Sequence, residues 1–142
     1  MPLATTLAEV TDAIRDVLDA AKVELGLDEV YYGPQDLMPT FPSVYVRSGP
    51  LDRTIHATHQ WALDLNVIID LFYGTIQSGE INQYEAEQKA DQIATKLHED
   101  DYLGGKVIFG FVTRIEPVTV RRNDVMIRTI RITWTGDSRQ TF

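Results

Sequence analysis

The stretch 59–72 alternates between its two faces over an unusual length. One face carries only large apolar side chains: Trp61, Leu63, Leu65, Val67, Ile69 and Leu71. A period of two predicts a β-strand that buries one face, but typical strands run about five or six residues. At about 3.3 Å per residue this strand would span about 45 Å, more than the width of a compact domain of this size. We therefore predict that the strand bends, or that part of it projects beyond the core.

Two amphipathic segments predict helices, one before this strand and one after it. Residues 6–25 place apolar side chains at the three-four spacing of one helical stripe. Thr6 and Glu9 form a capping box at the start, and Gly26 supplies the left-handed residue that ends a helix. Residues 81–98 repeat the pattern with a strongly charged outer face.

Shorter strands are expected at 29–32 and 43–47, the second of them directly after Pro42. Proline before a strand indicates an edge or a strand start. The following residues, 48–58, are polar and contain Gly and Pro, so they predict an exposed loop.

The C-terminal part predicts two long strands joined by a turn. Residues 106–115 begin apolar on both faces, which predicts a central strand, and Gly110 within them predicts a bulge or a close backbone approach. The strand continues through 118–121, and the last strand covers 125–135. Residues 136–142 are expected to form a polar tail.

This order of elements predicts a single α+β domain over residues 1–142. It would hold one mixed or antiparallel sheet with an extended hairpin and two helices packed on one face. No internal repeat or linker interrupts the chain.

Charge is unevenly distributed along the chain, whose formal net charge is −8. Residues 1–105 hold 6 basic and 18 acidic side chains, whereas residues 106–142 hold 7 basic and 3 acidic ones. The two regions could neutralise each other within one chain, or an acidic face of one copy could meet a basic face of the next. The acidic total argues against tight non-specific binding to nucleic acid, which requires Lys and Arg.

The sequence gives few indications of cellular location or redox compartment. Absence of cysteine excludes disulfides and thiolate zinc sites. The first residues lack the basic charge of a signal peptide, and no apolar run is long enough to span a membrane. We expect a protein made in the cytoplasm, with no membrane partner.

No motif predicts a catalytic residue, a cofactor or a metal site, so we expect that the protein is not an enzyme. Residues 74–79 have the glycine spacing of a phosphate loop, but Glu80 stands where lysine is required and would repel phosphate. His56 and His59 have ligand-like spacing without a third ligand nearby in the sequence. The alternative is a small ligand-binding domain, in which His59, Asp64, Asp70 and His98 would have to converge on a pocket.

Four segments together resemble the tail terminator proteins of long-tailed bacteriophages, also called tail completion or head-to-tail joining proteins. They are the opening helix at 3–25, the hairpin formed by 41–46 and 59–72, the acidic helix at 81–97, and the closing strands at 106–135. The resemblance covers nearly the whole chain and rests on the size of the chain and on the order and general character of its segments.

The resemblance implies a structural virion protein that forms a homo-hexameric ring on the head-proximal end of the tail tube. Such a ring would end tube polymerisation, contact the tail tube protein and a neck or connector protein, and let DNA pass through its lumen without specific binding. It would be assembled in the host cytoplasm. Neck and head-completion connector proteins of the same virions are similarly small and ring-forming, so they remain an alternative.

The same resemblance directs attention to polar residues that would contact another subunit. We predict that the 48–58 segment and the turn before the last strand form this contact. The candidate interface residues are Asp52, Arg53, His56, His59, Arg121 and Arg122.

Overall fold

The computed structural model describes residues 6–32, 40–57, 60–75, 82–122 and 124–141. The helices are α1 (Leu7–Ala20), α2 (Lys22–Leu25) and α3 (Gln83–Leu97). The strands are β1 (Glu29–Tyr32), β2 (Ser43–Ala57), β3 (Gln60–Thr75), β4 (Phe109–Arg122) and β5 (Val125–Thr141). These elements confirm the predicted α+β class.

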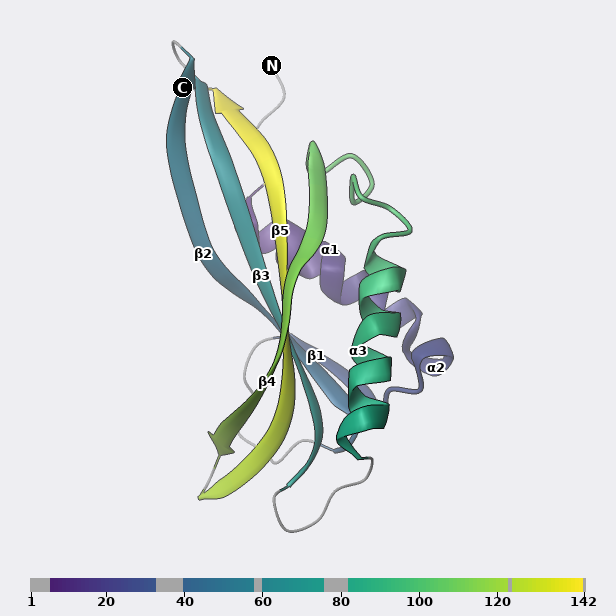
Figure 1. The fold of residues 1–142 in the computed structure, drawn as a ribbon. Coiled ribbons are helices and arrows are strands. Elements are labelled where there is room, and N and C mark those ends of the chain that lie inside the picture. The colour runs from purple at the N-terminus through teal and green to yellow at the C-terminus, as the bar shows by residue number, and fades with distance from the viewer. Residues whose placement is uncertain (1–5, 33–39, 58–59, 76–81, 123, 142) are drawn as a thin grey trace.

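All five strands form one sheet in the order β1-β2-β3-β5-β4. β1 pairs with β2 in parallel, and every other neighbouring pair is antiparallel. The helices cover one face of this mixed sheet, as predicted (Figure 1). We call the other face the open face.

Local capping explains where the helices begin and end. The Thr6 hydroxyl accepts a hydrogen bond from the Glu9 backbone N–H at 3.1 Å, and Gly26 ends α2 with a φ of 68°. Only Ala21 separates α1 from α2, so the predicted helix at 6–25 is nearly continuous. The Asn82 side chain caps α3 by accepting from the Glu85 N–H at 2.8 Å.

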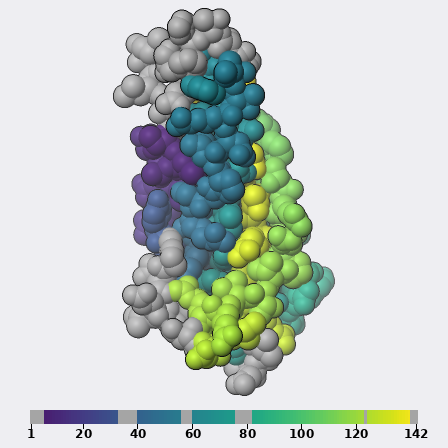
Figure 2. Space-filling model, turned by 90° about the vertical axis from the view of Figure 1, so that its left-hand side faces the viewer, coloured from purple at the N-terminus to yellow at the C-terminus, as the bar shows by residue number. Residues whose placement is uncertain are grey.

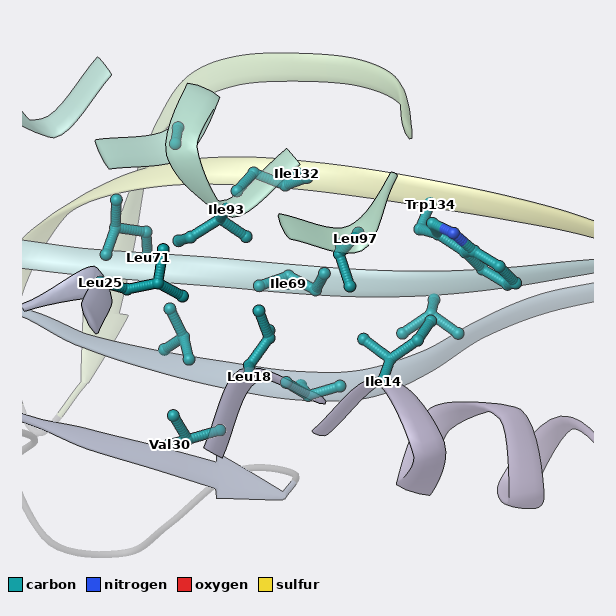
Figure 3. Packing of buried hydrophobic residues seen from close by; sticks show 14 of the residues in the cluster. Ile14, Leu18, Leu25, Val30, Ile69, Leu71, Ile93, Leu97, Ile132 and Trp134 are labelled. Carbon is teal, nitrogen blue, oxygen red and sulfur yellow. The ribbon is translucent and has the colours of Figure 1, made fainter. Parts of the chain in front are cut away.

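The core lies between the helices and the covered face of the sheet. Ile14 and Leu18 of α1 and Ile93 of α3 pack with Ile69 and Ile132 from the central strands (Figure 3). The apolar face predicted for β3 is buried from Leu63 to Leu71, with no side chain of that face more than 3% exposed. Periodicity therefore located the main core correctly, because burial selects every second residue of a strand.

Gly110 makes the close backbone approach that the sequence predicted. Gly110 and Gly136 are directly opposite each other in β4 and β5, and the buried Trp134 indole lies against both. A Cβ at Gly110 would lie 2.0 Å from Trp134 Cζ2, and a Cβ at Gly136 would lie 2.4 Å from Trp134 Cη2. Only glycine fits at either position while the ring keeps its place.

Two segments predicted as irregular are strands. Residues 48–57 of the predicted 48–58 loop belong to β2, and 136–141 of the predicted tail belong to β5; residues 58 and 142 lie outside the described part. Both segments pair with β3. Residues 51–55 of β2 are all exposed, so this part of the strand lacks the alternation that burial imposes.

These segments form a projection that we call the arm, made of residues 51–57, 60–65 and 136–141. Figure 1 shows it extending past the helices at the end of a strongly bent sheet. β4 begins with Phe109, opposite Asp137, so the last residues of β5 pair only with β3. The long strand β3 thus both bends and projects.

The prediction that 106–115 forms a central strand was wrong, because β4 lies at the edge of the sheet. Its second apolar face is exposed on the surface instead of being covered. At the other end of the sheet the β4–β5 hairpin curls over the open face (Figure 2). Arg122 there lies over the Tyr45 ring of β2, with 4.7 Å from Cζ to the ring centroid.

Candidate functional site

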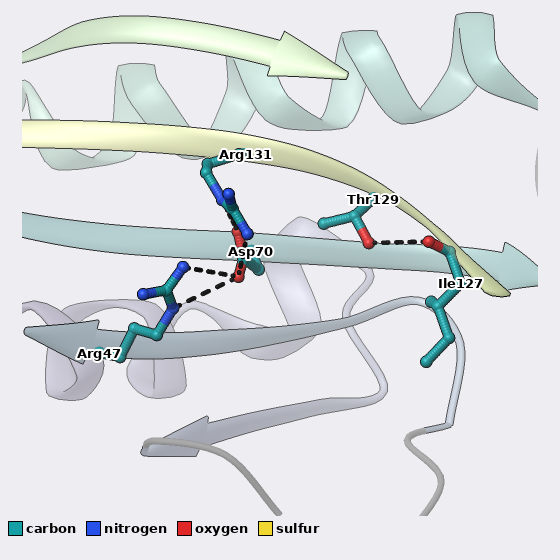
Figure 4. A network of polar contacts seen from close by, with 5 residues as sticks. All are labelled: Arg47, Asp70, Ile127, Thr129 and Arg131. Atoms are coloured by element: carbon teal, nitrogen blue, oxygen red, sulfur yellow. Dashed lines mark hydrogen bonds and ion pairs between the residues drawn. The ribbon is translucent and has the colours of Figure 1, made fainter. Parts of the chain in front are cut away.

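The centre of the open face is held by an ion-pair network (Figure 4). Asp70, only 4% exposed, accepts from Arg131 Nε at 2.8 Å, and Arg47 Nε lies 3.5 Å from its other oxygen. Hydrogen bonding to Asp70 raises the pKa of Arg131. Both oxygens of Asp70 face guanidinium groups, so this network joins β2, β3 and β5 and engages the whole carboxylate of Asp70.

A row of three aspartates crosses the arm on the open face. Asp52 of β2 lies opposite Asp64 of β3, which lies opposite Asp137 of β5. Arg139 Nη1 contacts Asp137 at 2.6 Å, but Asp52 and Asp64 form no ion pair with any described residue. Like charges directly opposite each other destabilise a sheet, so this row favours an external cation or basic partner.

The outer edge of β4 carries an exposed apolar and basic surface. Phe109 and Phe111 are each 44% exposed on the open face, with ring centroids 5.5 Å apart. Arg114 follows on the same face, and its guanidinium meets Glu116 at 2.9 Å in an exposed ion pair. Ile115, on the opposite face of β4, is 38% exposed.

The outer edge of β2 is free along the arm. β1 pairs only with residues 43–46 of β2, and above them β2 has no outer neighbour in the described ranges. Leu51 and Ile55 are 37% and 67% exposed there. The outer edge of β4 is instead covered at its start, where the Gly110 N–H donates to the Asp101 carbonyl oxygen at 2.7 Å and the Val112 N–H donates to His98 Nε2 at 3.0 Å. Unprotected edges are templates for pairing with another chain, so the free stretch of β2 on the arm is the stronger candidate.

The residues predicted for the interface lie at two distant places. Asp52 and Arg53 are exposed on the arm, and His56 is part of β2. Arg121 and Arg122 end β4 at the opposite end of the sheet (Figure 1). The structure therefore does not bring the two groups together.

Both arginines of that pair have partners in their own chain. Arg121 Nη2 contacts Asp124 at 2.7 Å across the hairpin turn, and Arg122 lies over Tyr45. His59 lies outside the described residues. Participation of the six residues in a subunit contact stays a prediction.

Of the residues proposed for a ligand pocket, the three that the structure describes do not converge. Asp64 lies on the arm and Asp70 at the centre of the open face, whereas His98 follows α3 and accepts a hydrogen bond from the Val112 N–H at 3.0 Å. Among the described residues, no three His, Cys, Asp or Glu side chains are placed to hold a metal ion. Within the same ranges, no helix has the length and apolar character needed to cross a membrane.

Open hollows also lie among the described residues. One, of about 300 Å³, lies between Tyr73, Pro117 and Arg128, and the other, of about 330 Å³, lies between α2 and α3 around Glu24 and Lys96. Lys96 contacts Glu24 and Glu99 at 3.1 Å and 2.9 Å, so these charged groups are engaged with one another. The arm and the two sheet edges are the more distinctive features of the molecule.

Comparison with known proteins gives a match at the level of structure. No protein-family model matches the chain, and no curated protein matches it. The fold is similar to a chain from a solved structure described as the virion of a native gene transfer agent particle, with a TM-score of 0.60 and 16% sequence identity. The similarity covers 91% of this chain and 93% of that chain, so the two share the fold almost from end to end.

Proposed function

We propose that this protein is a structural component of a phage-like virion, where it forms a ring that caps the tail tube and joins it to the neck. The observation that carries the proposal is the end-to-end fold similarity to a chain of a gene transfer agent virion. Because nearly all of both chains is matched, the similarity concerns a whole subunit and not a common sub-structure. The tail terminator resemblance of the sequence supplies the more specific role.

The surface of the molecule is consistent with a ring subunit. A closed ring uses a heterologous contact, which requires two different surfaces on each copy. The sheet offers two such surfaces, the free edge of β2 on the arm and the exposed side chains of β4 at the other edge of the sheet. Both carry exposed apolar side chains, as interface residues do.

The charge of the chain suits a conduit for DNA better than a DNA-binding surface. With a net charge of −8, a ring of this protein would not hold phosphates by counterion release. Its partners would be further copies of itself, the tail tube protein and a neck or connector protein. No enzymatic step is part of the proposal.

The oligomeric mass of the purified protein tests the proposal first. Light scattering over a range of protein and salt concentrations should give about six times 16.1 kDa, directly or as concentration rises. Rings seen by electron microscopy should then bind to the ends of isolated tail tubes. Rings that bind neck complexes but not tubes would favour a connector. A monomer at every concentration that binds neither structure would overturn the proposal.

A further inference from the structure

The direction of the backbone groups in the arm follows from one hydrogen bond. The Ile108 N–H donates to the Asp137 carbonyl oxygen at 2.8 Å, so Asp137 points its backbone groups toward β4. Directly opposed residues of an antiparallel pair either exchange both hydrogen bonds or point away from each other. Asp64, opposite Asp137 in β3, therefore points its groups toward β2, and Asp52, opposite Asp64, points back toward β3.

The same alternation leaves the outer backbone groups of β2 without a neighbour. Since Asp52 points toward β3, the N–H and C=O groups of Leu51, Arg53 and Ile55 point away from the sheet. All three residues are exposed, and within the described ranges no strand lies beside them on that side. Pro50, which has no N–H, marks the lower limit of this edge. An exposed row of unpaired backbone groups is a template for another extended chain.

The side chains that flank this edge differ on the two faces of the arm. On the open face Asp52 lies opposite Asp64, and neither forms an ion pair with a described residue. On the other face Leu51 and Ile55 are 37% and 67% exposed. A strand added here places its alternate side chains on alternate faces. The edge therefore fits a segment that is basic on one face and apolar on the other, since opposite charges and apolar groups form stabilising cross-strand pairs.

The described strands of a second copy offer no free edge with this pattern. On β4 the N–H groups of Gly110 and Val112 already donate within their own chain, and Pro117 has no N–H to donate. β1, at the other edge of the sheet, is four residues long and carries the acidic Glu29. The segment that fits the arm therefore belongs to a different protein.

We propose that residues 51–55 of β2 bind an extended segment of a different protein, which adds a strand to the arm. Its basic side chains lie beside Asp52, and its apolar side chains lie beside Leu51 and Ile55. Main-chain hydrogen bonds give such strand addition its affinity, and the alternate side chains give it selectivity. The inference rests on the proposed function for its setting, in which the partner is the tail tube or neck protein. Side chains on the two faces of the arm remain available to the adjoining copy in the ring.

Synthetic peptides test whether a strand is added. By fluorescence anisotropy, a labelled peptide of alternating arginine and valine should bind about tenfold more tightly than one with the same residues in two blocks, because only the first presents each kind on one face. Methylation of backbone nitrogens then removes chosen N–H groups. In an antiparallel ladder the valine N–H groups face β2, so methylation at the valines should abolish binding and methylation at the arginines should not, whereas a parallel ladder reverses the two. Equal binding of the two methylated peptides would overturn the inference.

Variants of the chain test where the peptide binds. Asp52→Arg should weaken binding by about tenfold or more, whereas Asp12→Arg, the same charge change at an exposed site on α1, is the matched control and should change it far less. Equal effects of the two would show a general attraction to an acidic chain and overturn the inference. Arg53→Pro removes an N–H that points away from β3 and should also weaken binding, whereas Arg53→Ala keeps that N–H and should bind at least as well as the wild type. Circular dichroism identifies a variant that fails to fold, and the methylated peptides then decide.

Hydrogen exchange separates this inference from the proposed function. Without peptide, the N–H groups of Leu51, Arg53 and Ile55 should exchange faster than that of Asp52. Protection of these three groups in rings of the purified protein would mean that a second copy occupies the edge, which overturns the inference and leaves the ring intact. Rings that bind tail tubes but not the alternating peptide would do the same. A chain that binds the peptide but never forms rings or binds tail components would overturn the proposed function alone.

Discussion

Replacing Gly110 with alanine should destabilise the fold, although the general effect of such a change in a strand is favourable. Alanine removes freedom from the unfolded chain and stabilises a compatible site by about 0.4–1 kcal/mol. At Gly110 the new Cβ would lie 2.0 Å from Trp134 Cζ2 and 2.7 Å from Cε2. Carbon atoms in contact are about 3.5–4.0 Å apart, so the indole must move by about 1.5 Å.

The indole has little room for that movement. Trp134 is 2% exposed and lies over Gly136 as well as Gly110. Overpacking of a filled core costs about 1–3 kcal/mol, occasionally more, and this clash involves a rigid ring. We expect Gly110→Ala to lower the free energy of unfolding by about 3 kcal/mol.

A double-mutant cycle measures the clash directly. Trp134→Leu removes the ring atoms that Cβ would meet and should itself lower stability by about 2–4 kcal/mol. The double variant should be no less stable than Trp134→Leu alone, which gives a coupling of about 3 kcal/mol. Urea unfolding followed by circular dichroism provides the four free energies.

Gly49 provides the control, because an added Cβ there would make a milder contact than at Gly110. At Gly49, in β2, the nearest atom to a built Cβ is the Asn66 carbonyl oxygen at 3.1 Å, so a small shift suffices. Gly49→Ala should change stability by less than about 1 kcal/mol. Two results would refute the reasoning: a Gly110→Ala cost no greater than that of Gly49→Ala, or effects of Gly110→Ala and Trp134→Leu that simply add.

Two further predictions concern the open face. Asp70→Asn should lower the free energy of unfolding by about 2 kcal/mol, since it leaves two partly exposed guanidinium groups without their carboxylate, and an unchanged urea midpoint would contradict this. Burial raises the pKa of Tyr45, partly offset by Arg122, so the folded chain keeps this proton where the unfolded chain loses it. That contribution is complete below about pH 10 and is lost as pH rises through the folded pKa, so Tyr45→Phe should flatten the alkaline fall in stability. The free energy of unfolding measured at pH 8 and pH 11 checks this prediction, with Tyr84→Phe at an exposed site as the control. An equal loss of stability between these pH values in Tyr45→Phe and the wild type would contradict it.

Sequence periodicity predicted the parts of the fold that are shaped by burial. The apolar stripe of 6–25 and the alternating face of β3 both lie in the core, because the stripe packs against the covered face of the sheet and the apolar residues of β3 form part of that face. The upper part of β2 was missed for the same reason. Its residues are exposed and are strand only because β3 lies beside them, and no local pattern records a neighbour.

For the candidate site, too, the sequence showed single residues but not how the strands align them. Asp52 and Arg53 were predicted as interface residues from the sequence because they lie in a polar segment beside a long hairpin, and their exposure on the arm leaves that prediction open. The alignment of Asp52 with Asp64 and Asp137 depends on the registers of three strands, which a single sequence does not contain. Phe109 was visible as an apolar residue but was assigned to a central strand, because an exposed apolar face and a buried one look alike in sequence.

Trp134 has a mechanical consequence for any assembly built from this chain. The indole and its two glycines lie where the arm leaves the body that the helices cover. In a closed ring of identical subunits, any change in the angle between the arm and the body is repeated in every subunit. A ring of fixed diameter therefore requires that this angle vary little. The Trp134 indole packs against the backbone at this junction and would restrict bending of the arm relative to the body. In the proposed oligomeric ring, the curvature would then be set by the shape of each subunit before two copies meet.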